Sequence, residues 1–70
     1  MTDYLVIYET DEDGGWGAYS PDLPGVFAVG ETRKEVESRM ADAITLHIQG
    51  LREQGIEVPA PHHDAGRIVV

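Results

Sequence analysis

The 70-residue chain is long enough for one small domain, and because it contains no cysteine it excludes disulfide bonds and cysteine-based metal sites. Thirteen Asp and Glu residues against five Lys and Arg residues give a formal net charge of −8, which opposes direct binding to nucleic acid or to an anionic membrane. The sequence has no apolar stretch of membrane-spanning length and no basic, apolar leader, so we expect a cytoplasmic protein that needs no cofactor.

The negative charge is concentrated in the first half of the chain. Residues 1–31 contain no Lys or Arg and seven acids: Asp3, Glu9, Asp11, Glu12, Asp13, Asp22 and Glu31. Such a surface would steer a basic protein partner toward it, although the charge could equally serve solubility alone. A domain of this size without cross-links is also marginally stable by itself, and we expect it to form a homo-oligomer.

The first half predicts three β-strands separated by two turns. Residues 4–10 are rich in β-branched and aromatic side chains, which is typical of a strand, and residues 16–20 form the returning strand. Between them, residues 11–15 combine acids with two glycines, as tight hairpins require. The Pro-Asp-Leu-Pro-Gly segment, residues 21–25, predicts a second fixed turn, and a third strand follows at 26–29.

The alternation of side chains assigns the predicted hairpin two faces. If Thr10 pairs with Trp16, one face carries Val6, Tyr8, Trp16 and Ala18, and the other carries Leu5, Ile7 and Tyr19. We expect a helix to cover one face and to leave the face with Tyr8 and Trp16 open. Exposed aromatic patches usually mark protein interfaces, and this one could serve either a partner or the homo-oligomer.

The second half predicts one helix and one further strand. Thr32 and Glu35 have the spacing of a capping box, in which each side chain satisfies a backbone N–H of the first turn. An apolar stripe follows and Gly55 marks the end of the helix. Residues 67–70 predict a short last strand. The expected fold is therefore a single α+β domain, residues 1–70, in the order β-β-β-α-β with the helix on one sheet face.

No arrangement of residues in the sequence predicts catalysis. Asp11, Glu12 and Asp13 share one exposed turn and cannot form the buried carboxylate cluster that two-metal nucleases need. The group His62, His63 and Asp64, with His47 as a fourth candidate, suggests a metal site. Neighbouring side chains in an extended segment point apart, however, so we predict neither a metal site nor an enzyme.

The arrangement of these segments resembles a known family. The acidic, glycine-rich hairpin turn, the aromatic strand and the Pro-Asp-Leu-Pro-Gly block at 21–25 are similar to the N-terminal domain of HicB antitoxins. The likeness continues through Gly30-Glu31-Thr32, the helix start and the Gly-Arg-Ile-Val-Val segment at 66–70. Val26 stands where family members often carry Cys. Many HicB proteins also carry a DNA-binding segment, which this sequence lacks, so we expect no DNA binding by the chain itself.

The resemblance implies a partial, degenerate ribonuclease-H-like fold without catalytic carboxylates, and a function as an antitoxin. Its implied partner is a HicA-type toxin, a small basic protein that cleaves mRNA and whose active site the antitoxin masks. We predict that the partner contacts Asp11, Glu12, Asp13, Tyr8, Trp16 and Asp22. Two alternatives remain open, a solitary self-associating module that binds another protein or a small ligand, and a minimal metal-dependent hydrolase.

Overall fold

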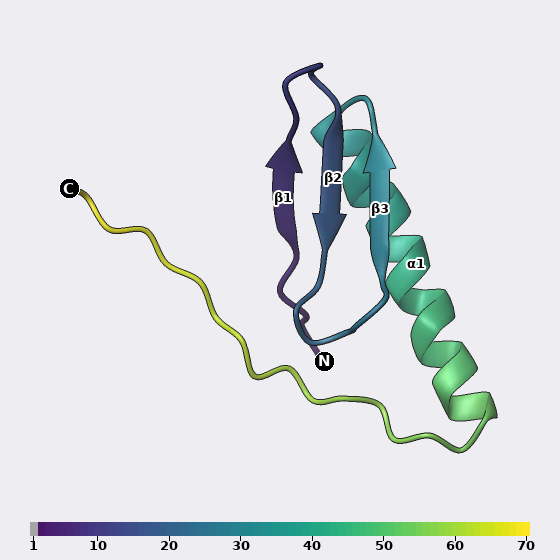
Figure 1. The fold of residues 1–70 in the computed structure, drawn as a ribbon. Helices are drawn as coiled ribbons and strands as arrows, with labels where there is room; N and C mark the ends of the chain where they lie inside the picture. The colour runs from purple at the N-terminus through teal and green to yellow at the C-terminus, as the bar shows by residue number, and fades with distance from the viewer. Residues whose placement is uncertain (1) are drawn as a thin grey trace.

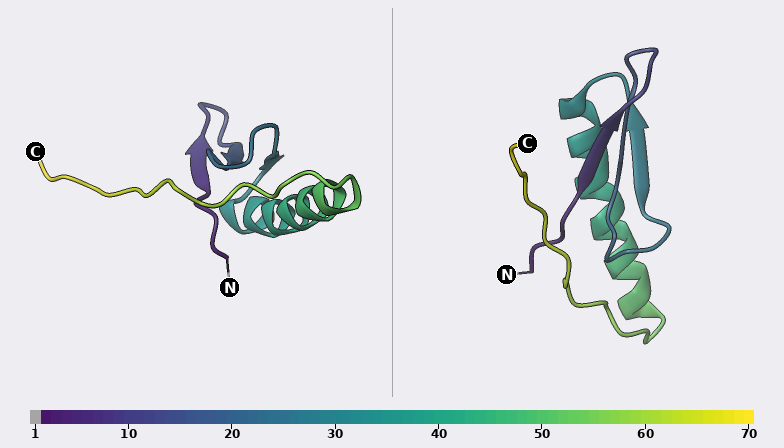
Figure 2. Two further views of the ribbon diagram at one scale, coloured as in Figure 1. Left: turned by 90° about the horizontal axis from the view of Figure 1, so that it is seen from below. Right: turned by 60° about the vertical axis from the view of Figure 1, so that its left-hand side comes forward.

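The computed structural model describes residues 2–70 and consists of three strands and one helix. Strands β1 (Ile7–Thr10), β2 (Trp16–Tyr19) and β3 (Phe27–Gly30) form an antiparallel sheet in the order β1-β2-β3. Helix α1 (Arg33–Glu53) follows and packs on one face of this sheet (Figures 1 and 2). The predicted α+β class, the three strands and the helix are confirmed. No helix within residues 2–70 is long and apolar enough to cross a membrane.

The hairpin turn between β1 and β2 is organised by Asp11. Its carboxylate oxygen Oδ1 accepts hydrogen bonds from the backbone N–H groups of Asp13 and Gly15, both at 2.9 Å. The backbone N–H of Asp11 donates to the carbonyl of Gly15 at 3.0 Å, and Gly14 adopts a φ of 85°, which an L side chain rarely tolerates. One of the three acids at this tip therefore has a structural role in addition to its charge.

The helix start differs in one respect from the predicted capping box. The Thr32 hydroxyl accepts a hydrogen bond from the Glu35 N–H at 3.1 Å, as predicted. The Glu35 carboxylate pairs with Arg39 at 2.7 Å instead of reaching back to the backbone of Thr32. Arg39 also donates to the carbonyl oxygen of Val29 at 2.7 Å, and it thereby joins the first turns of α1 to β3.

The helix covers the sheet face that we expected to remain open, and this part of the prediction is wrong. The core comprises Ala18, Leu23, Val26, Ala28, Val36 and Met40, and Tyr4, Val6, Tyr8, Trp16, Ala43 and Ile44 pack against it. The physical reason is the small size of residues at the centre of this face. Ala18 lies opposite Ala28, and a Cβ atom on Gly30 would come within 3.0 Å of Val36. Only such small residues let α1 approach this closely.

The predicted last strand is absent from the structure, so the order is β-β-β-α. Residues 67–70 extend away from β1 (Figure 1), and the sheet has three strands. Ile68 and Val69 are 89% and 98% exposed. The chain after α1 is attached to the domain near its base, where the Tyr4 hydroxyl donates to the Pro59 carbonyl at 2.6 Å. Beyond His63 the described tail makes no backbone hydrogen bond to the sheet, which leaves residues 67–70, three of them apolar, without a strand partner.

Candidate functional site

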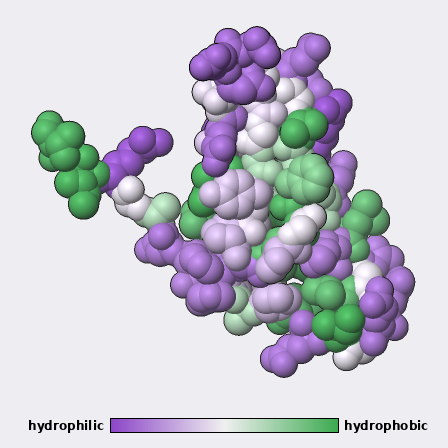
Figure 3. All heavy atoms as spheres, in the orientation of Figure 1, coloured by the Kyte–Doolittle hydropathy of each residue, from purple (hydrophilic) through white to green (hydrophobic). Residues whose placement is uncertain are grey.

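The tip of the β1–β2 hairpin carries three exposed acids at one end of the sheet. Asp11, Glu12 and Asp13 all lie at the surface, within the hydrophilic cap seen at the top of Figure 3. Asp11 has its Oδ1 atom engaged in the turn, whereas the side chains of Glu12 and Asp13 make no hydrogen bond or ion pair to any described residue. The structure therefore brings these three predicted residues together and leaves two of them available for a partner.

The sheet face that α1 does not cover is apolar. Tyr19, Phe27 and Val29 are 42%, 69% and 62% exposed, and Ile7, Tyr19 and Phe27 form one cross-strand row. We call Tyr19, Phe27 and Val29 the open face. Figure 3 looks onto it and shows hydrophobic atoms between the polar hairpin tip above and polar groups below. A contiguous apolar patch of this kind commonly marks a surface that meets another molecule.

A shallow groove of about 420 Å³ connects the acidic tip to the open face. Its lining combines residues of both: Glu9, Thr10, Asp11, Gly15, Trp16, Gly17, Val29 and Gly30. An apolar floor beside acidic groups is suited to a protein surface that presents a basic side chain with an apolar stem. The sequence does not single out Phe27 or Val29, because we expected the helix to cover the opposite face of the hairpin from the one that α1 covers.

Tyr8 and Trp16, which we predicted as exposed anchors, are half-buried between the sheet and α1. The guanidinium carbon of Arg33 lies 4.3 Å from the centre of the Tyr8 ring, so this ring is covered by a cation–π contact. Trp16 is among the residues that line the groove. Their first role is therefore packing within the domain, and the prediction that they form an open patch is corrected.

Asp22 is buried and binds the C-terminal tail. Its side chain is 0% exposed, and Oδ1 accepts hydrogen bonds from the backbone N–H of His62 at 3.1 Å and from Nδ1 of His63 at 2.6 Å. The other oxygen, Oδ2, has no hydrogen-bond partner within the described chain. In this structure Asp22 thus faces the tail and not the surface on which the other predicted partner contacts lie. The sequence did not reveal this contact, because Asp22 and His62 are 40 positions apart in the chain.

The environment of Asp22 changes its acidity in two opposite ways. Burial raises its pKa, and the hydrogen bonds from His63 and His62 together with the charge of the two imidazoles lower it by more. The net pKa lies below the ordinary value, so the buried side chain remains a carboxylate at neutral pH.

The lowered pKa of Asp22 predicts that the wild-type protein and an Asp22→Asn variant differ in stability by an amount that depends on pH. In the unfolded chain Asp22 titrates near ~3.9, above its folded value, so its contribution to stability is present above about pH 4 and is lost as pH falls through the folded pKa. Asp22→Asn should therefore be less stable than the wild-type protein at neutral pH, and the gap should narrow in acid. Urea unfolding of both proteins between acidic and neutral pH, with EDTA present, measures the difference in their free energy of unfolding. A difference that does not change with pH would contradict the lowered pKa of Asp22.

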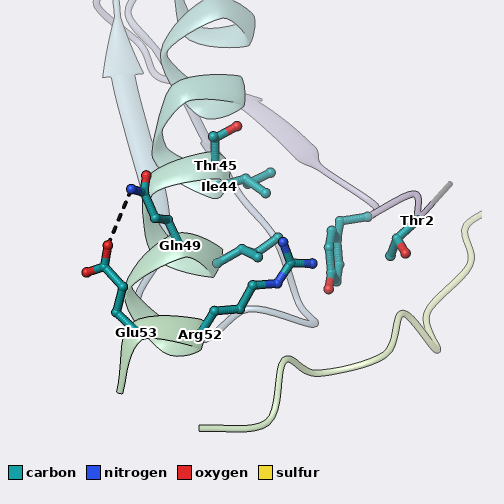
Figure 4. A pocket seen from close by; sticks show the side chains of 8 residues that line it. Thr2, Ile44, Thr45, Gln49, Arg52 and Glu53 are labelled. Atoms are coloured by element: carbon teal, nitrogen blue, oxygen red, sulfur yellow. Dashed lines mark hydrogen bonds between the residues drawn. The ribbon is translucent and has the colours of Figure 1, made fainter. Parts of the chain in front are cut away.

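A second groove, of about 620 Å³, lies between the second half of α1 and the segment that leads into β1 (Figure 4). Tyr4, Ile44 and Ile48 form its apolar part, and Arg52 lies at its polar rim. The side-chain amide of Gln49 donates a 3.4 Å hydrogen bond to Glu53 on the same rim. The apolar side formed by Tyr4, Ile44 and Ile48 suits contact with an apolar segment of a partner.

Within residues 2–70, one group of three side chains has the spacing to hold a metal ion, Asp22 with His62 and His63. The predicted His47 and Asp64 do not belong to it, and Asp64 accepts a local hydrogen bond from the Ala65 N–H. The expectation that His62 and His63 point apart is wrong, since both Nδ1 atoms lie within 3 Å of Asp22 Oδ1. A single carboxylate is nevertheless unlike the acid cluster of a two-metal nuclease.

The chain is similar to proteins of one family. Residues 4–66 match the family model described as the HicB-like antitoxin of bacterial toxin–antitoxin systems. An UPF0150 protein of Thermoplasma acidophilum is 38% identical over 56 residues, which cover 80% of this chain and 81% of the relative. The N-terminal domain of the Burkholderia pseudomallei antitoxin HicB superposes with a TM-score of 0.75 at 29% identity, covering 84% of this chain and 69% of that one. A chain of the HicA3–HicB3 toxin–antitoxin complex gives 0.69 at 30% identity, covering 87% and 70%.

Proposed function

The chain belongs to the HicB-like antitoxin family, whose members are generally not enzymes, and we propose that it binds a small basic HicA-type toxin and masks its RNA-cleaving site. A solved HicB3 relative stands in a complex with a HicA3 toxin. The observation in this chain that carries the proposal is the continuity of the acidic hairpin tip with the apolar open face. A basic protein would meet both at once.

The two parts of this surface would contribute differently to binding. Exposed charges at the rim of an interface mainly raise the association rate by steering the partner, and they are screened by salt. Desolvated apolar and aromatic groups mainly determine how slowly the complex dissociates. The proposal thus assigns Glu12 and Asp13 to steering and Phe27 with Val29 to anchoring.

The test is to express any small basic protein encoded next to this chain, and to measure its association with this chain and the inhibition of its RNA cleavage. Wild-type protein should suppress its RNA cleavage. The double variant Glu12→Gln/Asp13→Asn should associate roughly three- to tenfold more slowly at low salt, and the difference should vanish at high salt. Asp11 is left unchanged because it holds the turn.

A matched variant, Asp42→Asn/Glu57→Gln, removes the same charge from exposed positions outside the hairpin tip and makes a suitable control. It should associate at close to the wild-type rate. Equal slowing in both variants would mean that net charge, not the hairpin tip, steers the partner. If the wild-type protein neither binds nor inhibits the neighbouring protein, the antitoxin proposal fails.

Self-association is the second candidate function, and a specific observation favours it. The open face and the tail residues Ile68, Val69 and Val70 leave six large apolar side chains exposed. A second copy could cover either. This alternative makes the open face an interface between identical chains, and it predicts that Phe27→Ala lowers the mass of the oligomer.

A further inference from the structure

Two histidines from the tail converge on one buried carboxylate from the turn between β2 and β3. Nδ1 of His63 lies 2.6 Å and Nδ1 of His62 lies 2.9 Å from Asp22 Oδ1. The two imidazole rings lie with their centroids 4.4 Å apart, and one ligand atom from each residue lies within 4.8 Å of the others. The proposed toxin-binding surface uses none of these three side chains.

Hydrogen bonding accounts for only part of this arrangement. Nδ1 of His62 has hydrogen-bond geometry toward the carbonyl oxygen of Ala60, 3.2 Å away, so its approach to Asp22 is a close contact without a well-directed hydrogen bond. Asp22 Oδ2 is fully buried and receives no donor within residues 2–70. A buried carboxylate with one unsatisfied oxygen is costly unless positive charge compensates it.

We propose that Asp22, His62 and His63 form a binding site for one Zn²⁺-like transition-metal ion, which clasps the tail to the turn. The carboxylate and the two Nδ1 atoms supply three ligands, and water completes a tetrahedron. Imidazole with carboxylate suits Zn²⁺, Co²⁺, Ni²⁺ and Cu²⁺, whereas Mg²⁺ and Ca²⁺ prefer oxygen ligands throughout.

The two Nδ1–Oδ1 distances require only a small adjustment to accept the ion. With metal–ligand bonds of about 2.0–2.1 Å, tetrahedral ligands lie about 3.3 Å apart, so the two Nδ1–Oδ1 distances must open by less than about 1 Å. The side chains of His62 and His63 are 71% and 43% exposed and can move, whereas Asp22 is held in the buried turn. An ion here would compensate the negative charge of the buried carboxylate and fix the direction in which residues 64–70 leave the domain.

The experiment is a titration of the tag-free, full-length chain with ZnCl₂ by calorimetry, and with Co²⁺ by visible absorption. We expect one ion per chain with a micromolar dissociation constant, and intense Co²⁺ bands typical of tetrahedral coordination. His63→Ala and His62→Ala should each weaken binding at least roughly tenfold. Both side chains lie outside the core, so these variants should keep the wild-type far-ultraviolet circular dichroism.

His47→Ala is the matched control, because it removes the remaining histidine, which is not part of the group. It should bind zinc like the wild-type chain. Absence of zinc binding, binding that survives both tail variants, or binding abolished by His47→Ala would each overturn the proposal. None of these outcomes depends on a toxin, so the result is separate from the antitoxin proposal.

Discussion

Leu23→Ala is expected to destabilise the protein by about 2–5 kcal/mol, the cost of removing a large aliphatic side chain from a packed core. Leu23 is 0% exposed, although it lies in a turn between two prolines. The turn is closed by the hydrogen bonds Leu23 N–H to Ser20 O and Val26 N–H to Leu23 O, both 3.2 Å, which point the side chain into the core. The turn thus contributes one of the three largest fully buried side chains, with Met40 and Val36.

The effect should be large relative to the total stability. A 70-residue domain has about 3.5–10 kcal/mol available, so the loss can unfold a substantial fraction of the molecules. Urea unfolding followed by the fluorescence of Trp16, the single tryptophan and half-buried against the core, measures it directly. Leu46→Ala makes the same chemical change at a helix position that is 68% exposed, and it should cost less than about 0.5 kcal/mol. Equal losses in both variants would contradict the packing described for the turn.

The local elements of this fold could be predicted because their signals lie within a few residues of one another. Gly14 and Asp11 specify the hairpin turn, and the Thr32 hydroxyl caps α1 as its sequence context predicts. The acidic tip followed directly from the turn, since three consecutive charged residues in a hairpin loop must be exposed. These conclusions depend on backbone geometry and on no distant contact.

The features that the sequence did not predict depend on contacts between distant segments. Both hairpin faces alternate apolar residues, so the pattern alone cannot say which face α1 covers. The decisive signal was the small size of Ala18, Ala28 and Gly30, which lie on the helix side and permit close packing. The attachment of His62 and His63 to Asp22 spans 40 positions and has no periodic signal. The last strand was predicted wrongly for the same reason. The β-propensity of residues 67–70 indicates that they can form a strand, but it does not say which strand they would pair with.

Phe27→Ala is expected to weaken toxin binding by about 2 kcal/mol or more, roughly 30-fold in Kd, if the open face anchors the partner. Phe27 is 69% exposed on β3, it lies outside the core cluster, and the row it shares with Ile7 and Tyr19 faces away from α1. The domain should therefore keep its stability while the complex dissociates faster. Trp16→Ala would not test this, because Trp16 packs against the core and its loss would destabilise the domain itself.

The same variant distinguishes the two proposed uses of the open face. If the face binds a toxin, Phe27→Ala speeds dissociation of the complex and leaves the mass of the isolated protein in sedimentation unchanged. If the face joins copies of this chain, the oligomer mass falls toward the 7.7 kDa monomer and toxin affinity stays near the wild-type value. The exposed Leu46 on α1 again supplies the control, since Leu46→Ala removes a comparable apolar side chain outside the sheet and should change neither quantity. A Phe27 variant that binds toxin normally and keeps its oligomer mass would exclude the open face from both interfaces. The groove beside Tyr4 and Ile44 and the exposed tail residues Ile68, Val69 and Val70 would then be the apolar surfaces to test next.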